Sequence, residues 1–533
     1  MKPPPTITNP ILPGFNPDPS ILRVGDDYYI ATSTFEWFPG VQIHHSRDLV
    51  NWHLLTRPLD RVSQLNMIGV RPSAGIWAPC LTHADGLFWL TYTVVRTMLK
   101  DEPNYIVTAP AITGPWSEPI PLNGIGFDPS LFHDDDGKKY LVQMAVDPHR
   151  RDHFFKGIYL TEFDPAARKL VGPRRMIFHK CIGGTEGPHL YKRGAYYYLM
   201  VAEGGTGYDH AVTVARSKDL WGPYEADPQT PLITSRDRPD LALQKAGHGS
   251  LVETQTGDWY VPHLCGRPLP LDATHTERRC ILGRETALQK VEWTEDGWLR
   301  LVGGGNSPAT SVAAPALPPH PFPLEPDTDH FDAPTLGIHW QTLRVPADAS
   351  WLTLSERPGH LRLYGRDSLQ SHFDLSLVAR RIDHFQAHYE TALDYAPKNP
   401  WQMAGLTVFY GSENHYFLAV SLGDDGRRRL LLFVRNGQDE KQIIPDDGIV
   451  IPDTGTLRLA ARLDNWDIQF SWAAGADELQ PIGPVVDSSI LSDEVASWGF
   501  TGAFIGLCAQ DLEGTRQPAD FDYFKTTTAS STN

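Results

Sequence analysis

Three acidic residues, Asp18, Asp128 and Glu186, each lie in a short turn-like segment rich in proline or glycine. Hydrolysis of a glycosidic bond requires a proton for the leaving oxygen and a base or nucleophile at the anomeric carbon. Two carboxyl groups can supply both when their surroundings separate their pKa values. In an inverting enzyme they stand about 6.5–9.5 Å apart, which leaves space for the attacking water.

The surroundings of each carboxylate suggest a role. Glu186 has only uncharged neighbours, so partial burial would raise its pKa and keep it protonated as a general acid. Asp18 stands between Pro17 and Pro19, whose stiff backbone suits a fixed general base. Asp128 would then be a third carboxylate near the acid, where its negative charge raises the pKa of the acid and orients it.

Other side chains could complete a sugar site, although each has an ordinary structural explanation. Arg284 could keep a carboxylate ionised or bind a hydroxyl group, or it could pair with the adjacent Glu285. His248 by itself would most often be a hydrogen-bonded structural histidine. Candidate aromatic platforms for a sugar face are Phe35, Trp37, Phe38 and Trp77, but most aromatic side chains belong to a core.

A repeated strand pattern provides the elements that would position these residues. An acidic or glycine turn followed by bulky residues recurs five times, ending at Ile30, Leu90, Leu141, Leu199 and Val261. These ends are 60, 51, 58 and 62 residues apart, which leaves room for about four strands in each copy. The period predicts an all-β domain that folds as a five-bladed β-propeller.

The repeat also aligns the candidate site residues. Twelve or thirteen residues before the five aliphatic ends stand Asp18, Trp77, Asp128, Glu186 and His248. Because the first strand of every propeller blade lines the central axis, equivalent positions in different blades should converge on one funnel. The alternative is five independent turn residues, since Asp-Pro and Glu-Gly are common in loops.

The composition of the chain changes after the fifth repeat. Residues 313–328 form a proline-rich linker, and strand-like alternation resumes from about residue 329. We therefore expect a propeller over residues 1–312 and an antiparallel β-sandwich over residues 329–533.

Charge and cysteine content exclude several classes of protein. The formal net charge of −17 argues against a nucleic-acid partner, because phosphate binding requires clustered Lys and Arg. No run of about eighteen apolar residues exists, so we expect no membrane span. The first five residues form no apolar segment, and the five cysteines are scattered, so we expect a cytoplasmic protein with reduced thiols.

Long motifs along the chain resemble those of the β-xylosidases and α-L-arabinofuranosidases of glycoside hydrolase family 43. They extend from about residue 9 to Phe524. The segments that carry the resemblance are 9–20, 29–41, 75–79, 126–134, 185–191, 202–206, 282–286 and 500–504.

The resemblance implies a five-bladed propeller followed by a concanavalin-like β-sandwich, and exo-acting, inverting release of D-xylose from the non-reducing ends of β-1,4-xylo-oligosaccharides. It makes Asp18 the general base, Glu186 the general acid and Asp128 the pKa modulator. The pocket residues that it implies are Phe35, Trp77, Thr206, His248 and Arg284, with Phe504 of the second domain closing the pocket. It also implies a homo-oligomer, either a tetramer or a dimer.

Some positions depart from the family pattern, namely Cys80 after Trp-Ala-Pro, the stretch 70–74, and Ala145-Val146. None touches the three carboxylates, but a changed pocket rim could favour α-L-arabinofuranosides or a bifunctional enzyme. A non-catalytic sugar-binding propeller is a further alternative, which would be expected to lack one of the carboxylates. No cofactor is required for the chemistry, although Asp332 and Asp522 could help hold a structural Ca²⁺ in the sandwich.

Overall fold

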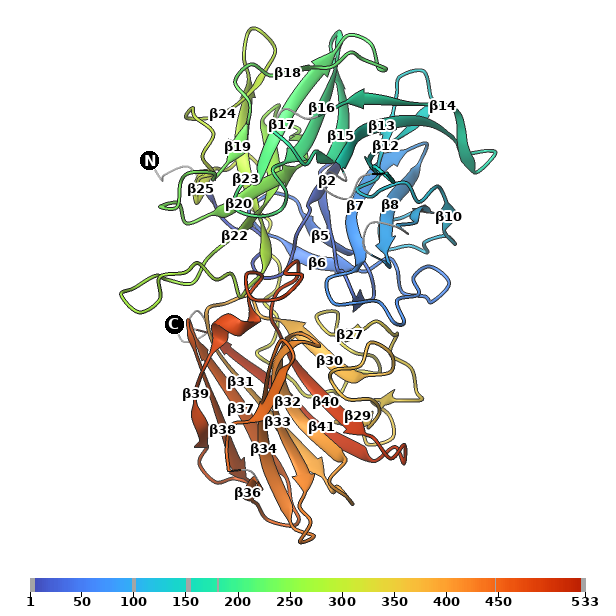
Figure 1. The fold of residues 1–533 in the computed structure, drawn as a ribbon. Coiled ribbons are helices and arrows are strands. Elements are labelled where there is room, and N and C mark those ends of the chain that lie inside the picture. The colour runs from blue at the N-terminus through green and yellow to red at the C-terminus, as the bar shows by residue number, and fades with distance from the viewer. Residues whose placement is uncertain (1–4, 98–101, 150–154, 180–181, 446, 529–533) are drawn as a thin grey trace. The chain divides into compact units, whose positions relative to one another are not determined.

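The described part of the chain is built almost entirely from β-strands. A computed structural model describes residues 5–97, 102–149, 155–179, 182–445 and 447–528, and within these ranges the one helical element is the short 3-10 helix η1 (Ser488–Leu491). The chain divides into two units (Figure 1). The first contains residues 1–65, 74–267 and 284–322, and the second contains residues 66–73, 268–283 and 323–533.

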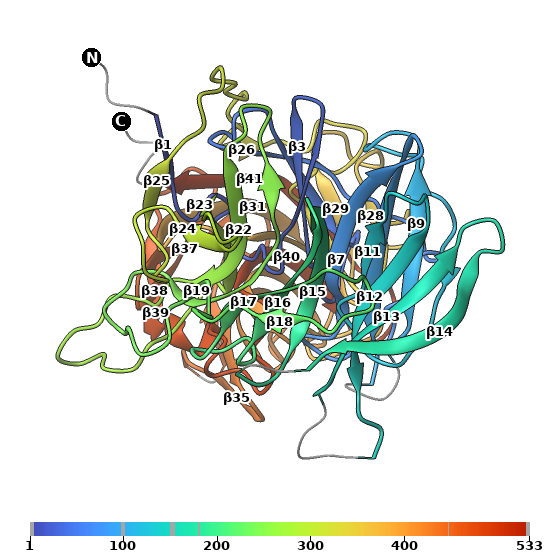
Figure 2. The same cartoon turned by 90° about the horizontal axis from the view of Figure 1, so that it is seen from above.

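The first unit is a five-bladed β-propeller. It contains five antiparallel sheets, each with a path of four strands in chain order, and the colours in Figure 2 pass from blue to yellow-green around the propeller. The four-strand paths are β2 (Ser20–Val24), β3 (Asp27–Thr32), β5 (Gln42–Ser46), β6 (His53–Thr56); β7 (Gly75–Ala84), β8 (Leu87–Val95), β9 (Asn104–Ala109), β10 (Ile120–Pro121); β11 (Ser130–His133), β12 (Lys139–Val146), β13 (Phe155–Asp164), β14 (Lys169–Phe178); β15 (Glu186–Arg193), β16 (Tyr196–Glu203), β17 (Ala211–Ser217), β18 (Glu225–Ala226); and β20 (Gln244–Gly249), β22 (Trp259–Gly266), β23 (Arg284–Trp293), β24 (Leu299–Leu301).

Shorter strands complete this unit. β19 (Ile233–Thr234) pairs with β17, and β21 (Val252–Glu253) pairs with β22. β1 (Thr6–Thr8) pairs with β25 (Ser311–Ala313), which joins the two ends of the propeller chain. The dipeptide strand β4 (Trp37–Phe38) follows β3.

The five aliphatic repeat ends all lie in second strands of blades, as the period predicts. Ile30, Leu90, Leu141, Leu199 and Val261 belong to β3, β8, β12, β16 and β22, and each is at most 1% exposed. Apolar clusters lie between successive blades, where the faces of two sheets meet. One such cluster joins Phe132 and Val142 of the third blade to Leu190 and Val201 of the fourth.

The second unit is a β-sandwich of two antiparallel sheets with a shared core. One sheet has the order β28-β29-β41-β31-β37-β38-β39, with β26 beside β41, and the other contains β35-β34-β33-β32-β40-β30-β27, with β36 beside β34. The core contains Leu393, Leu459 and Phe470 of the first sheet and Leu406 and Leu507 of the second. The strands are β26 (Thr328–Asp329), β27 (Gln341–Leu343), β28 (Leu352–Thr353), β29 (Leu361–Tyr364), β30 (Ser376–Arg381), β31 (Gln386–Tyr395), β32 (Gln402–Gly411), β33 (Asn414–Leu422), β34 (Arg428–Asn436), β35 (Asp439–Gln442), β36 (Ile449–Val450), β37 (Leu457–Asp464), β38 (Asp467–Ala474), β39 (Gln480–Asp487), β40 (Phe504–Asp511) and β41 (Pro518–Thr528).

The segments between the two folds are packed rather than extended. The proline-rich segment belongs to the propeller unit as far as residue 322, where the amide of His320 donates to Asp48 at 2.7 Å. Two segments from the N-terminal half belong to the sandwich unit. In one, the Val70 carbonyl accepts from Arg344, and in the other the Pro270 carbonyl accepts from Trp466 at 2.7 Å. The boundaries expected from the sequence, at residues 312 and 329, do not include these two segments in the sandwich unit.

No helix in the described ranges is long and apolar enough to cross a membrane.

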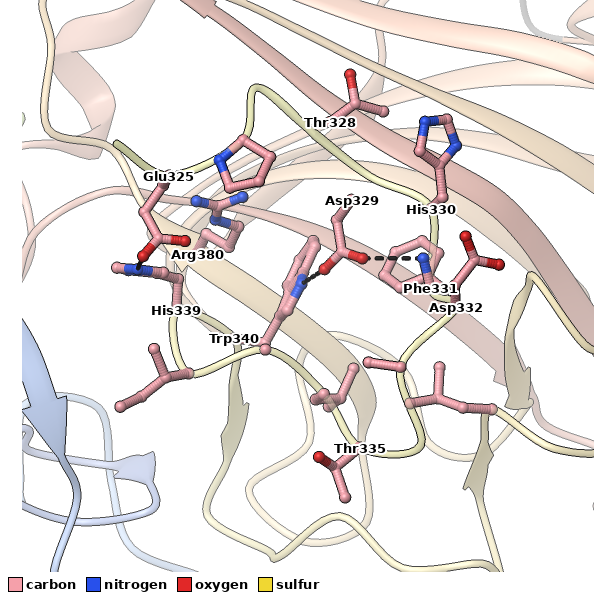
Figure 3. A pocket seen from close by; sticks show the side chains of 16 residues that line it. Glu325, Thr328, Asp329, His330, Phe331, Asp332, Thr335, His339, Trp340 and Arg380 are labelled. Atoms are coloured by element: carbon pink, nitrogen blue, oxygen red, sulfur yellow. Dashed lines mark hydrogen bonds and ion pairs between the residues drawn. The ribbon is translucent and has the colours of Figure 1, made fainter. Parts of the chain in front are cut away.

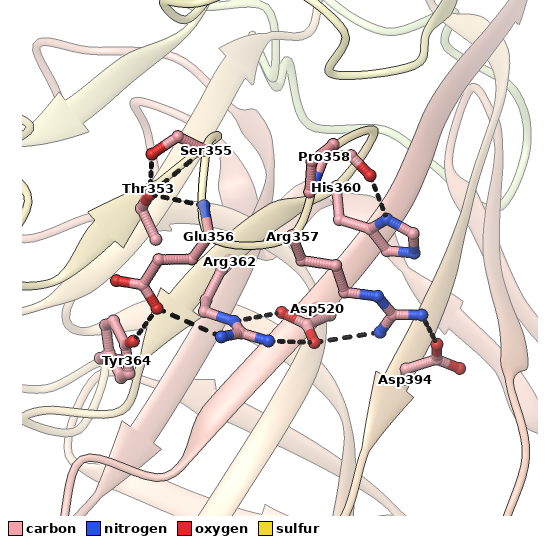
Figure 4. A network of polar contacts seen from close by, with 10 residues as sticks. All are labelled: Thr353, Ser355, Glu356, Arg357, Pro358, His360, Arg362, Tyr364, Asp394 and Asp520. Atoms are coloured by element: carbon pink, nitrogen blue, oxygen red, sulfur yellow. Dashed lines mark hydrogen bonds and ion pairs between the residues drawn. The ribbon is translucent and has the colours of Figure 1, made fainter.

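A network of ion pairs joins three strands of the sandwich (Figure 4). The Asp520 carboxylate on β41 accepts from the Arg362 guanidinium at 2.7 and 2.9 Å and from Arg357 at 3.0 Å. Arg357 also donates to Asp394 on β31, and Arg362 donates to Glu356. Burial opposes ionisation of Asp520, but the two arginines outweigh it and lower its pKa.

We expect Asp520→Asn to destabilise the sandwich by about 2–3 kcal/mol, because two partly buried guanidinium groups lose their shared carboxylate. In the wild type, the stabilisation of the folded state by ionised Asp520 is fully present above the ordinary carboxyl pKa. It is lost as the pH falls through the lowered pKa of Asp520. Urea unfolding at pH 7 measures the effect. Asp522→Asn, two residues along the same strand at an exposed position, is the matched control and should change stability little.

Candidate active site

The five aligned positions lie in, or two residues before, the first strands of the five blades. Glu186 is the first residue of β15, and Asp18 and Asp128 stand two residues before β2 and β11. Trp77 and His248 lie within β7 and β20. Each first strand contacts the first strand of the next blade, and β21 of the last blade contacts β2 of the first. The propeller therefore gathers residues that are up to 230 positions apart in the sequence.

The backbone at these positions is unusual. Asp18, Asp128 and His248 have φ angles of 57°, 54° and 49°, which lie in the left-handed region that few non-glycine residues adopt. In the fourth blade the left-handed residue is Gly187, directly after Glu186, with φ 55°. Such strain persists only where surrounding contacts impose it, and it concentrates at functional sites.

Asp18 is buried and surrounded by donors and positive charge. Its Oδ2 accepts from the Ser33 hydroxyl at 2.6 Å, and its Oδ1 accepts from Arg284 Nη1 at 3.2 Å. His248 Nδ1 lies 3.7 Å from the same Oδ1. Burial opposes ionisation, but Arg284, His248 and the Ser33 hydrogen bond outweigh it and hold the pKa of Asp18 below its ordinary value. Asp18 is therefore ionised at neutral pH.

Asp128 and Glu186 have the opposite electrostatic character. Burial, and then the negative charge of Asp18, raises the pKa of Asp128 to about 8. Burial, followed by the charges of Asp128 and Asp18, raises the pKa of Glu186 well above its ordinary value. The two groups titrate as a pair and retain a proton at neutral pH. The Gly187 amide donates to Asp128 Oδ2 at 2.8 Å, which favours the charge on Asp128 and the proton on Glu186.

The remaining predicted propeller residues lie around this centre. Arg284 Nη1 also donates to the Thr206 hydroxyl at 2.8 Å, and the guanidinium carbon lies 5.1 Å from the centre of the Phe35 ring. Phe35 and Trp77 are neighbours, with ring centres 5.8 Å apart. His248 packs against Gly187 so closely that a Cβ on Gly187 would lie 2.9 Å from the imidazole. Burial lowers the pKa of His248, which therefore stays neutral at pH 7.

Comparison with known proteins identifies the family. The model of glycosyl hydrolases family 43 matches residues 7–299, and the model of the β-xylosidase C-terminal concanavalin A-like domain matches residues 328–527. The chain belongs to glycosyl hydrolase family 43. The propeller that contains the ion-paired Asp18 and the protonated pair of Asp128 and Glu186 is therefore the propeller of a glycoside hydrolase.

Relatives match this family 43 chain over nearly its whole length. Xylosidase/arabinosidase 43B of Humicola insolens is 51% identical over 98% of this chain and 97% of that protein. A xylan 1,3-β-xylosidase of a Vibrio species is 49% identical over 98% of this chain and 99% of that protein. The crystal structure of xylan β-1,4-xylosidase from Bacillus halodurans C-125 superposes with a TM-score of 0.95 at 54% identity, over 98% of this chain and all of the other.

Two of the departures from the family pattern, Cys80 and Ala145-Val146, have contacts of their own. The Cys80 thiol on β7 is buried 3.9 Å from His189 Nδ1. Ala145 and Val146 lie at an irregularity in the pairing of β12 with β13. A Cβ on Gly126 would lie 2.8 Å from the Cα of Ala145, so the backbones pack closely there.

Two further predictions concern the second unit. Phe504 is the first residue of β40, and its ring centre lies 5.3 Å from the Arg381 guanidinium carbon. The closure of the active-site pocket by Phe504 stays a prediction.

The two residues predicted to help hold a structural Ca²⁺ belong to the second unit. Asp332 lines a cavity of about 370 Å³ in the sandwich (Figure 3), whereas Asp522 is exposed on β41 and does not line it. In the same cavity the Asp329 carboxylate already accepts from Trp340 Nε1 at 2.8 Å and from the Phe331 amide at 2.9 Å. Within the described ranges, no group of three or more His, Cys, Asp or Glu side chains could hold a metal ion. A structural Ca²⁺ held with the help of Asp332 and Asp522 stays a prediction.

Sequence reasoning missed three residues of this site. Ser33 bridges two blades, since its hydroxyl oxygen also accepts from the Ala78 amide at 2.8 Å. Gly187 supplies both the amide for Asp128 and the space for His248. Glu203 is a fully buried carboxylate that contacts the segment before Glu186. Ser33 and Glu203 lie inside motifs of the family resemblance, but those motifs do not indicate which members hold the carboxylates.

Proposed function

We propose that this family 43 enzyme is an exo-acting, inverting β-xylosidase that releases D-xylose from the non-reducing ends of β-1,4-xylo-oligosaccharides. The observation that carries the proposal is the separation of carboxyl pKa values in one site. Asp18 is held ionised, whereas the Asp128 and Glu186 pair is held protonated. Relatives that match 98% of the chain are named as xylosidases, which supports the substrate class.

In the proposed reaction Asp18 removes a proton from a water molecule as the water attacks the anomeric carbon. Glu186 delivers its proton to the glycosidic oxygen, so that the leaving sugar departs as a neutral alcohol. After one turnover Asp18 carries the proton from water and Glu186 is ionised, and exchange with solvent restores both. Direct attack by water on the face opposite the leaving group inverts the configuration.

The neighbouring residues support this division of roles. The Arg284 guanidinium and the Ser33 hydroxyl stabilise the negative charge on Asp18, so the base is ready before substrate binds. Asp128 makes ionisation of Glu186 unfavourable and so keeps the acid protonated. Phe35 and Trp77 would pack against the apolar face of the terminal sugar.

The stereochemistry of the product tests the reaction. We expect α-D-xylose to be the first anomer released from an aryl β-D-xyloside, whose leaving group is not a sugar, with the β-anomer appearing only by later mutarotation, because water attacks directly. Proton NMR during the first minutes of hydrolysis distinguishes the two anomeric signals. Initial release of the β-anomer would indicate a covalent intermediate and would contradict Asp18 as a base for water.

A second candidate specificity is hydrolysis of α-L-arabinofuranosides, alone or together with xylosides. One relative at 51% identity is named xylosidase/arabinosidase, and this observation favours a bifunctional enzyme. We expect kcat/KM to be higher for an aryl β-D-xyloside than for the matching aryl α-L-arabinofuranoside. A strong preference for the arabinofuranoside would overturn the proposed substrate. Parallel assays with β-1,3- and β-1,4-xylobiose test the linkage, since another relative is named for the 1,3 bond.

A further inference from the structure

Glu203, the last residue of β16, is a buried carboxylate that the proposed reaction does not use. Its side chain is inaccessible to solvent. The Ile182 amide donates to both carboxylate oxygens at 3.2 Å, and the hydroxyls of Thr185 and Thr213 donate at 3.0 and 2.9 Å. A buried acidic group is rarely retained unless it is bonded in this way.

Two of these three donor residues belong to the segment that leads into the general acid. Ile182 and Thr185 stand four residues and one residue before Glu186. Across the sheet, Glu186 pairs with Ala202, the residue directly before Glu203. One further bond holds the same segment, because the Gly204 amide donates to the Gly183 carbonyl at 2.6 Å. Glu203 therefore fixes the approach to Glu186 from the neighbouring strand.

The segment needs such an anchor because its own residues provide little stiffness. Gly183 and Gly184 have φ angles of 137° and 62°, conformations that glycine adopts freely and that leave the backbone many alternatives. A Cβ on Gly183 would meet no neighbour within 4 Å, so side-chain packing does not restrain it there. The bonds to Glu203 on either side of these two glycines limit their freedom.

We propose that Glu203 is a positioning residue for the general acid, and that it holds the 182–186 segment so that the Glu186 carboxyl faces the glycosidic oxygen. The inference rests on the proposed function, in which Glu186 is the proton donor. Glu203 acts through Ile182 and Thr185 and does not itself transfer a proton. The third donor residue, Thr213, holds Glu203 from the opposite side on β17 and does not contact the acid segment through this bond.

Proton donation by Glu186 matters most when the leaving group is a poor one. Glu203→Gln keeps the size of the side chain but places an amide NH₂ among donors, so at least one of them loses its acceptor. Thr185→Val removes the hydroxyl next to Glu186 and leaves Glu203 intact. For both variants we expect kcat/KM on β-1,4-xylobiose to fall about 100-fold, the effect of a small misplacement of a reacting group. On an aryl xyloside with a good leaving group, the expected loss is less than about tenfold.

The matched control is Thr213→Val, which removes a bond to the same carboxylate on the side away from the acid. We expect it to keep the wild-type ratio of the two kcat/KM values. Equal losses on both substrates, or no loss, in Thr185→Val and Glu203→Gln would overturn the positioning role. If Glu203→Gln does not fold, as judged by circular dichroism, Thr185→Val decides the outcome.

Glu186→Gln, measured in parallel, separates this inference from the proposed function. If Glu186→Gln shows the leaving-group dependence and the other two variants do not, only the role of Glu203 fails. If Glu186→Gln itself lacks that dependence, the assignment of the acid fails. The alkaline limb of the pH profile of kcat gives a second readout, because a displaced Glu186 has different charges around it and should titrate at a different pH.

Discussion

Replacement of Asp18 by asparagine is expected to lower kcat by about 10⁴-fold on every xyloside, whatever its leaving group, because the attacking water then has no base. An amide oxygen can still orient water but cannot accept its proton at neutral pH. The loss should therefore be similar on xylobiose and on an aryl xyloside with a good leaving group. Initial rates at saturating concentrations of each substrate measure the loss of kcat.

Ser33→Ala serves as the matched control for Asp18, because it removes the 2.6 Å hydrogen bond to Asp18 Oδ2 and retains the carboxylate. The pKa of Asp18 should then rise, since one of the groups that lowers it is gone. Activity in the wild type should fall only below the ordinary carboxyl range, where Asp18 protonates. In Ser33→Ala this acid limb should move to higher pH. An Asp18→Asn enzyme that still hydrolyses activated aryl xylosides well would remove Asp18 from the role of base.

The blade repeat made much of the site predictable from the sequence. The spacing of five bulky segments fixes which strand of each blade they occupy, and side chains at the same register then share one axis. This reasoning identified the three carboxylates as site residues, because it is uncommon for acidic residues to stand at the same distance before several repeat ends. They are Asp18, Asp128 and Glu186. Thr206 had no such signal, and only the family resemblance indicated it.

Contacts between distant segments could not be predicted from local pattern. Arg284 stands 266 residues after Asp18. From the sequence alone, an ion pair with the adjacent Glu285 is an equally good expectation for its side chain. In the structure Glu285 instead pairs with Arg267 at 2.7 Å, which leaves Arg284 to Asp18. The transfer of residues 66–73 and 268–283 to the sandwich unit likewise depends on tertiary packing.

The left-handed backbone at Asp18, Asp128 and His248 connects the fold to the chemistry. Each such residue costs about 1–3 kcal/mol, which surrounding contacts must offset. Hydrogen bonds from Ser33 and Arg284 to Asp18, and from Gly187 to Asp128, provide that compensation. The same contacts set the pKa values of the carboxylates. Loss of one of them should therefore alter both the stability of the propeller and its pH profile.

Replacement of Glu186 by glutamine is expected to separate substrates by their leaving groups. On xylobiose, whose leaving sugar needs a proton, kcat/KM should fall about 10³-fold or more, whereas on an aryl xyloside with an acidic leaving phenol the loss should be about tenfold or less. The alkaline limb of the aryl xyloside profile should also disappear. In the wild type that limb reflects loss of the proton that burial and the charges of Asp128 and Asp18 hold on the carboxyl pair.

The same substitution at an exposed position, Glu253→Gln on β21, is the matched control and should leave the ratio of the two substrates unchanged. Equal losses on both substrates in Glu186→Gln would mean that Glu186 does not donate the proton. Asp128 would then be the remaining candidate, because its pKa is also raised and its carboxylate lies next to Gly187. Once Glu186 is excluded as the donor, a loss in Asp128→Asn that is far larger on xylobiose than on the aryl xyloside would identify Asp128 as the proton donor, whereas equal losses would exclude it as well.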